Sequence, residues 1–282
     1  MLRKKSVPRC QKLLKTKLLL VITASLLLLF SVNWWRNKQS DSVVKTSSDR
    51  AALEAAEGNL DLYPVTSLVR GVTLVNSHNL NKVEKNYQLD IPLKNQMSDP
   101  PLLYGCEVTA LGMILEYYGY EGNKNKLQEA IEKQPYQLTN GLMGNPHKGF
   151  VGDASGKQPG TGVYHEPIAR LAQKVVGEDY LVVDATGQSV KTLLAAIRQG
   201  SPVWVAVTID YSVPTANDFT MWQTSDGDVE VSHKYHAAVI TGYDEENIFL
   251  NDALGKRVTI KQEQFSEIYQ GMGKQSIYLT KN

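Results

Sequence analysis

Several common functional signatures are missing from this 282-residue sequence. After Arg36 there is no cluster of basic residues, which nucleic-acid binding requires, so we expect no nucleic-acid partner. The chain has only two cysteines, Cys10 and Cys106, and contains neither a C-x-x-C nor an H-E-x-x-H motif. Four of its histidines are scattered along the chain: His78, His147, His165 and His233. We therefore expect no metal ion and no cofactor.

A long uncharged run near the N-terminus follows a strongly basic stretch. Residues 1–17 carry seven basic residues and no acidic one, although the whole chain has a formal net charge of only +1. Residues 18–35 contain no charged side chain and would span about 27 Å as a helix, close to the hydrocarbon thickness of a bilayer. The run ends at Trp34 and Trp35, which suit a membrane interface and do not resemble a signal-peptide cleavage site. We expect an uncleaved single-pass anchor with a cytoplasmic N-terminus.

This anchor implies four consecutive parts of the chain. They are a basic cytoplasmic tail (1–17), a transmembrane anchor (18–35), a polar stalk or linker in which Val69–Val75 could form a short strand (36–86), and a folded extracytoplasmic domain (87–282). Cys10 then lies on the cytoplasmic side, so Cys106 has no cysteine partner in the folded domain. An unpaired thiol in an exported domain is a candidate reactive group.

Hydrophobic periodicity predicts an α+β domain in which helices precede strands. The expected helices are 106–118, Lys124–Gln134, Glu166–Val176 and one from an N-cap at Ser189 through Gln199. The expected strands are Pro202–Ile209, Ala237–Tyr243, Asn247–Asn251, Arg257–Ile260 and Ser276–Thr280. Residues 135–163 form a glycine-rich loop, and a loop of this length inside a compact domain is typically functional or disordered.

Cys106 occupies a favourable position for a nucleophile. It is expected in the first turn of the helix that ends at Gly119, where free backbone N–H groups and the helix dipole favour negative charge. This setting predicts a bias toward the thiolate, which is the nucleophilic form of cysteine. Taken alone, a small buried residue at the start of a core helix is the simpler interpretation.

A predicted hairpin supplies the partners that a nucleophilic cysteine needs. His236 begins one strand and Asp252 follows the next, with a short turn between them. Antiparallel pairing brings the start of the first strand beside the end of the second, so the two side chains are expected to be neighbours. A carboxylate beside an imidazole fixes its tautomer and stabilises the imidazolium, as a cysteine–histidine pair requires. His233 sits in a polar loop beside Lys234, which disfavours a protonated ring, so His236 is the expected base.

Ordered sequence blocks from about Tyr87 to the C-terminus carry a family resemblance. They are Ile91–Gln96, Gly105–Leu111, Tyr117–Gly119, Lys148–Asp153, Gly162–Tyr164, Pro202–Val205, His236–Asp244 and Asn251–Asp252. Together these blocks resemble the C39-like cysteine peptidases, which are relatives of the bacteriocin-processing peptidases. The resemblance implies a papain-like α+β fold, with the nucleophile helix packed on an antiparallel sheet.

The same resemblance assigns roles to individual residues. It implies that Cys106 is the nucleophile, His236 the general base and Asp252 the group that orients the imidazole. Gln96 corresponds to the glutamine whose side-chain amide helps to form the oxyanion hole, where one donor is typically worth ~2.7–4 kcal/mol. The glycine-rich loop includes a family block, so we expect Phe150 and Val151 to contact the substrate.

Three functions are compatible with these residues. The favoured function is a membrane-anchored cysteine peptidase that acts on peptides or proteins at the cell surface. A thiol-dependent cell-wall amidase or an acyl transferase would use the same residues on a different acyl donor. A non-catalytic adhesion or scaffold module would keep only the fold, and the complete set of Cys106, His236, Asp252 and Gln96 argues against it.

Overall fold

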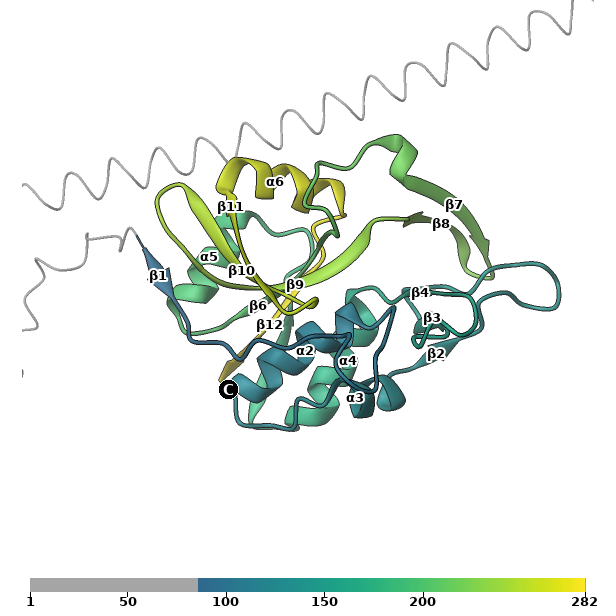
Figure 1. Ribbon diagram of the computed structural model, residues 1–282, viewed down its shortest axis with the longest axis horizontal. Helices are drawn as coiled ribbons and strands as arrows, with labels where there is room; N and C mark the ends of the chain where they lie inside the picture. The colour runs from purple at the N-terminus through teal and green to yellow at the C-terminus, as the bar shows by residue number, and fades with distance from the viewer. Residues whose placement is uncertain (1–85, 282) are drawn as a thin grey trace, which may run out of the picture. The chain divides into compact units, whose positions relative to one another are not determined.

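The computed structural model describes residues 86–281, which are drawn in colour in Figure 1. The expected tail (1–17), anchor (18–35) and nearly all of the stalk (36–86) lie outside the described residues. Between residues 86 and 281, no helix has the length and apolar character needed to cross a bilayer.

A seven-stranded antiparallel sheet forms the centre of the described domain. In spatial order its strands are β11 (Lys256–Lys261), β10 (Asn247–Asp252), β9 (Tyr235–Tyr243), β6 (Val203–Thr208), β12 (Ser276–Lys281) and β5 (Tyr180–Asp184), and β1 (Tyr87–Gln88) pairs with the end of β9. Strand β9 is buried at every position after its first residue. Its continuous apolar run is what a strand needs when it has neighbours on both sides and layers on both faces.

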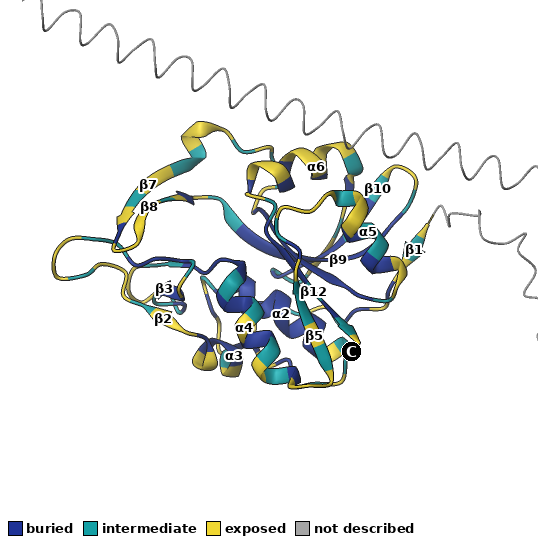
Figure 2. Ribbon diagram, turned by 180° about the vertical axis from the view of Figure 1, so that it is seen from behind, coloured by how far each residue is buried: buried dark blue, intermediate teal, exposed yellow. Residues whose placement is uncertain are grey.

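Helices cover both faces of this sheet (Figures 1 and 2). On one side lie α2 (Cys106–Tyr117), α3 (Lys124–Ala130) and α4 (His165–Val176), and on the other lie α5 (Val190–Arg198) and α6 (Gln262–Gly271). Every residue of α2 from Cys106 to Leu115 is buried, including its polar ones. Helix α2 is therefore buried in the core on all sides over these residues, whereas its apolar spacing predicted an amphipathic helix.

Local sequence signals fix several helix ends. The side chain of Ser189 accepts a hydrogen bond from the backbone N–H of Thr192 and caps α5, as predicted. After α2, Gly119 adopts a φ of +86°, a conformation that glycine reaches without steric cost. Helix α3 ends at Ala130, four residues earlier than predicted, because Lys133–Gln134 instead form β2 and pair with β3.

The glycine-rich segment is more ordered than a loop. Its β3 (Phe150–Gly152) and β4 (Gly160–Gly162) form a three-stranded sheet with β2 (Lys133–Gln134). A separate hairpin of β7 (Phe219–Thr224) and β8 (Gly227–Ser232), preceded by a short 3-10 turn at Ala216–Asp218, was not predicted, and neither were β5 and α6. The five predicted strands correspond to β6, β9, β10, β11 and β12, and the expected α+β class is confirmed.

Candidate active site

Helix α2 places Cys106 at its first residue, next to Gly105 at the N-cap. The Gly105 carbonyl closes the first turn of the helix. It accepts hydrogen bonds from the N–H and the hydroxyl of Thr109, at 3.0 and 2.7 Å. The Cys106 side chain is buried, and its thiol donates a hydrogen bond to Glu107 Oε2 over 3.2 Å. The predicted position of this cysteine in the first turn of a helix is therefore confirmed.

The environment of the thiol differs from the predicted one. Burial, followed by the negative charge of Glu107, raises the pKa of Cys106 well above its ordinary value. A hydrogen bond from the Ala237 backbone acts in the opposite direction but is a smaller effect. These surroundings favour the neutral thiol, contrary to the expected bias toward thiolate. The dipole of α2 is outweighed by desolvation and an adjacent carboxylate.

His236 and Asp252 meet across the β9–β10 pair as predicted. His236 Nε2 lies 3.0 Å from Asp252 Oδ1, and both residues are almost completely buried. Asp252 Oδ1 also accepts the Leu254 N–H at 2.6 Å, and Oδ2 accepts the Tyr211 hydroxyl at 2.7 Å. Burial opposes the charged carboxylate, but the hydrogen bond and charge of His236 keep the pKa of Asp252 below its ordinary value. With Nε2 engaged, Nδ1 is the nitrogen of His236 left to act on another group.

Cys106 and His236 line one cleft of about 570 Å³, together with Gln96. The segments around Leu103, Tyr136 and Gly160–Thr161 also line it. Further lining residues are Ile209 and, from the β7–β8 hairpin and the turn that follows it, Thr220, Trp222, Val231, Ser232 and His233. The rings of Tyr136 and Trp222 meet edge to face with centroids 5.6 Å apart. This volume lies in the range typical of ligand pockets.

Gln96 is buried, although a solvated loop residue would be exposed. Its backbone N–H donates to the Ala253 carbonyl at 2.7 Å, which ties it to the segment that follows Asp252. Its Nε2 donates to the carbonyls of Leu102 at 3.2 Å and Leu103 at 2.8 Å. Its Oε1 is a buried oxygen without a hydrogen-bond partner. The structure therefore brings Gln96 to the cleft with its amide nitrogen engaged by the chain.

Phe150 and Val151 do not occupy the position predicted for them. Both side chains are fully buried, and neither lines the cleft. Strand β3 pairs on both sides, with β2 and with β4, so its apolar side chains are used in packing. The same segment does reach the cleft, through Gly160 and Thr161. The structure therefore brings part of the loop to the cleft and places its two predicted apolar residues in the interior.

Glu107 is a site residue that sequence reasoning missed. It is fully buried, and its Oε1 accepts the Val163 N–H at 2.9 Å. Its backbone carbonyl accepts the indole N–H of Trp204 at 3.1 Å. Desolvation raises the pKa of Glu107 to about 7. A Cβ at Gly162 would lie 2.2 Å from Glu107 Oε1, so the close approach requires glycine there. In the sequence, the signal that could have identified Glu107 is an acidic residue among the apolar residues at the start of the predicted helix.

His233 lies in a different setting from His236. It is exposed in the turn after β8, and its Nε2 lies 2.8 Å from the Thr220 hydroxyl. The ammonium of Lys234 is held by Asp210 at 2.9 Å and Asp218 at 3.4 Å. His236, by contrast, has the buried carboxylate partner that orients a catalytic imidazole.

Comparison with known proteins gives the family of this chain. The sequence model described as the Peptidase_C39 like family matches residues 88–277. The chain is 39% identical over 194 residues to the uncharacterized protein YvpB of Bacillus subtilis (strain 168), covering 68% of this chain and 76% of that protein. It is 33% identical to a crystal structure from Bacillus anthracis, provisionally described as a C39-like peptidase, with a TM-score of 0.66 over 71% of this chain and 99% of that one. The chain therefore belongs to the C39-like peptidase family.

Proposed function

We propose that this protein is a cysteine peptidase that hydrolyses peptide bonds, with Cys106 as nucleophile and His236 as general base. One observation carries the proposal. Cys106 and His236 line the same cleft, and Asp252 holds the histidine by its other ring nitrogen. A nucleophile, a base and a group that orients the base form the set of roles that defines a catalytic triad.

The proposed reaction begins with proton transfer from the Cys106 thiol to His236 Nδ1. The sulfur attacks the scissile carbonyl carbon, a C–S bond forms, and the carbonyl oxygen becomes an oxyanion. When the C–N bond breaks, His236 returns the proton to the departing amine and an acyl-enzyme remains. Water, deprotonated by the same imidazole, then hydrolyses the thioester. Because burial and Glu107 raise the pKa of the Cys106 thiol, thiolate formation in this proposal is coupled to the protonation of His236.

The oxyanion is stabilised in this proposal by Gln96 and by the backbone N–H of Cys106 at the start of α2. One amide hydrogen of Gln96 continues to serve the neighbouring carbonyls of Leu102 and Leu103, and the other turns to the oxyanion. Donors of this kind act on charge that develops in the transition state, which is why they accelerate the reaction.

The cleft supports a preference for apolar side chains next to the scissile bond. Leu103, Tyr136 and Ile209 line it and are exposed large apolar side chains. Exposed apolar groups of this size, gathered around a catalytic pair, are typical of a binding site rather than of ordinary surface. A peptide or protein substrate with an apolar residue near the scissile bond is therefore expected.

We also propose that the peptidase acts outside the cytoplasm, held to the membrane by residues 18–35. The support is the uncharged run and the basic tail before it. Protease added to intact cells should remove the folded domain (87–282) and leave the N-terminus protected. Protection of the folded domain in intact cells would overturn this topology.

The enzymatic proposal is tested with a peptidyl epoxide probe on the purified full chain. A Cys10→Ser variant leaves Cys106 as the single thiol and should label like the native protein, whereas Cys106→Ala should not label. A peptide library should then be cleaved by the native protein and not by Cys106→Ala. Cleavage of purified peptidoglycan with no cleavage of peptides would favour the amidase alternative, and labelling at Cys10 alone would contradict the proposal.

A further inference from the structure

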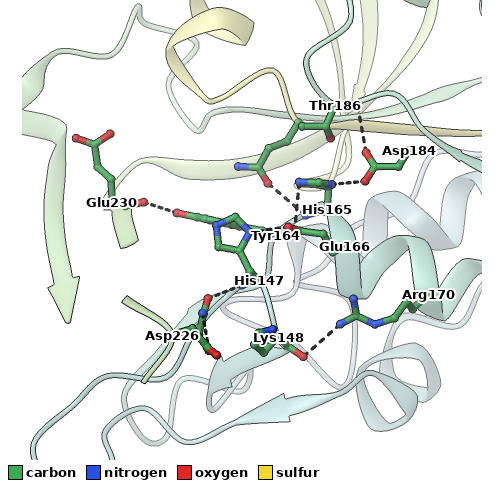
Figure 3. Close-up of polar contacts among 12 residues, drawn as sticks. His147, Lys148, Tyr164, His165, Glu166, Arg170, Asp184, Thr186, Asp226 and Glu230 are labelled. Atoms are coloured by element: carbon green, nitrogen blue, oxygen red, sulfur yellow. Dashed lines mark hydrogen bonds and ion pairs between the residues drawn. The ribbon is translucent and has the colours of Figure 1, made fainter. Parts of the chain in front are cut away.

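A second cluster of chemically active side chains lies outside the cleft. His147 comes from the segment before β3, and His165 and Glu166 come from the first turn of α4 (Figure 3). His147 Nδ1 lies 2.7 Å from Glu166 Oε1, and His165 Nε2 lies 3.3 Å from Glu166 Oε2. One possible ligand atom from each residue lies within 4.8 Å of the others. None of the three side chains lines the catalytic cleft.

We propose that His147, His165 and Glu166 form a binding site for a divalent transition metal ion such as Zn²⁺. Two imidazoles and one carboxylate are a donor set that zinc uses, commonly with water in the fourth position. Tetrahedral bonds of 2.0–2.2 Å place ligand atoms about 3.3–3.6 Å apart. The cluster reaches this spacing by small side-chain adjustments, because its atoms already lie within 4.8 Å.

The Asp184 carboxylate, which contacts the Nδ1 of His165, favours metal binding over a simple hydrogen-bond network. His165 Nδ1 lies 2.8 Å from Asp184 Oδ2, and Asp184 Oδ1 accepts the Thr186 N–H at 3.1 Å. A carboxylate on the far nitrogen of a histidine fixes the ring and leaves Nε2 to the metal, an arrangement found around most metal-bound histidines. The Nε2 of His165 faces Glu166, so the ring is oriented toward the proposed ion.

His147 is also held in place before any ion binds. Its backbone N–H donates to Asn145 Oδ1 at 3.0 Å, and Asn145 Nδ2 donates to Asp226 at 3.0 Å. Its ring meets Tyr164 edge to face at a centroid distance of 4.7 Å. The Tyr164 hydroxyl donates to the Glu230 carbonyl at 2.6 Å, as Figure 3 shows. Preorganised ligands lower the ordering cost of binding, so this scaffold supports a defined site.

Glu166 adds a second observation in favour of a ligand at this site. Its Oε2 is a buried atom that forms no hydrogen bond and has His165 Nε2 as a neighbour at 3.3 Å, whereas a buried carboxylate oxygen normally has a hydrogen-bond partner. A metal ion between Oε2 and His165 Nε2 would satisfy it. A pocket of about 520 Å³, lined by His147, Tyr164 and His165, adjoins the site and gives water access to the remaining coordination position.

The bound ion would join the β2–β4 segment to the start of α4. The sequence predicted no metal because residues 147, 165 and 166 are separated by a glycine-rich segment and match no short motif. Folding brings them together because β3 and β4 return the chain to the N-terminus of α4.

The test is a Zn²⁺ titration of the full chain carrying Cys10→Ser and Cys106→Ala, which removes both thiols as competing ligands. Calorimetry should show one site, and Zn²⁺ should raise the melting temperature. Adding His147→Ala should abolish both effects. Adding Asp184→Asn should weaken binding about 10–100-fold, as expected for a group that supports a metal ligand. Adding His233→Ala is the matched control and should leave the affinity unchanged.

Three outcomes would overturn the site. They are no Zn²⁺ binding by the chain without cysteines, undiminished binding with His147→Ala, or equal loss with His233→Ala. Circular dichroism of each variant establishes that it is folded, and His147→Gln serves as a second variant if His147→Ala unfolds.

Discussion

Two histidine–carboxylate pairs in this domain have similar geometry and different surroundings. His236 and Asp252 lie 3.0 Å apart with exposed side-chain fractions of 1% and 3%. His165 and Asp184 lie 2.8 Å apart, but their side chains are 11% and 41% exposed. Both carboxylates also accept a backbone N–H, from Leu254 and Thr186. Each pair therefore fixes one ring nitrogen and leaves the other free to act.

The difference lies in what faces the free nitrogen. His236 lines a cleft with a thiol, so its free nitrogen can accept a proton. His165 faces Glu166 and His147, so its free nitrogen has the neighbours of a metal ligand. A histidine–carboxylate pair alone therefore predicts an oriented imidazole, and the third group determines which chemistry follows.

The largest expected effect comes from removing either Cys106 or the histidine of the first pair. Cys106→Ala and His236→Ala should each lower kcat/KM by about 10⁴-fold or more, because a nucleophile and its base act as a unit. Peptide hydrolysis measures the loss. Zinc affinity should stay unchanged in Cys106→Ala, since the two sites have no ligand in common. Parallel loss of turnover and metal binding in one variant would show that the two pairs are not independent.

The next largest effect on turnover is expected from replacing the carboxylate of Asp252 by an amide. Asp252→Asn should lower kcat by less than the ~10⁴-fold seen when an amide forces the wrong tautomer in a serine protease. The reason is that the Asn Oδ1 can still accept from His236 Nε2 and Leu254, while the Tyr211 hydroxyl can turn to accept from the new amide. Zinc affinity should not change. A loss as large as that of His236→Ala would mean that the carboxylate charge, rather than orientation, is what His236 needs.

The first pair was predictable from sequence and the second was not. His236 and Asp252 lie on consecutive strands, so hairpin pairing alone brings them together. His165 and Asp184 lie on α4 and β5, and β5 was not recognised because its partner β12 lies about a hundred residues further along the chain. Contacts within a hairpin follow from local periodicity, whereas contacts between distant elements depend on the order of strands in the sheet.

The same reasoning explains the mistakes in the cleft. Cys106 was placed correctly because a helix start is a local feature, but its pKa depends on burial by β9 and on Glu107, which the helix dipole argument omitted. Phe150 was assigned to the cleft because its block resembles the family. Its full burial depends on pairing with β2, which had been predicted as the end of α3.

Glu107→Gln tests the carboxylate that distinguishes the Cys106 thiol, the proposed nucleophile, from an ordinary helix-start cysteine. The charge of Glu107 contributes to the raised pKa of Cys106, so removing that charge should move the alkylation profile of the thiol to lower pH. Rates of reaction with iodoacetamide across pH measure this shift. An unchanged profile would mean that desolvation alone sets the thiol pKa.

The same variant has a defined effect on stability. The pKa of Glu107 is raised from 4.5 to about 7, so the native state keeps a proton that the unfolded chain releases between these values. The free energy of unfolding should therefore fall as pH rises from 4.5 to 7, by on the order of 3 kcal/mol. Glu107→Gln should remove this part of the pH dependence. Urea unfolding at several pH values measures it, and identical pH slopes would contradict the assignment.

The smallest expected effect concerns His233, which lies three residues from His236 and lines the same cleft. Its ring contacts the Thr220 hydroxyl, whereas the ring of His236 contacts a carboxylate. His233 lacks the buried carboxylate that orients an imidazole, so it is unsuited to act as the base. His233→Ala should retain most of the turnover and alter KM at most modestly, because only a wall of the cleft changes. Steady-state kinetics on the best library peptide, beside His236→Ala, separates the two histidines. If His233→Ala were inactive and His236→Ala active, an oriented pair with a carboxylate would not be what makes a histidine catalytic in this fold.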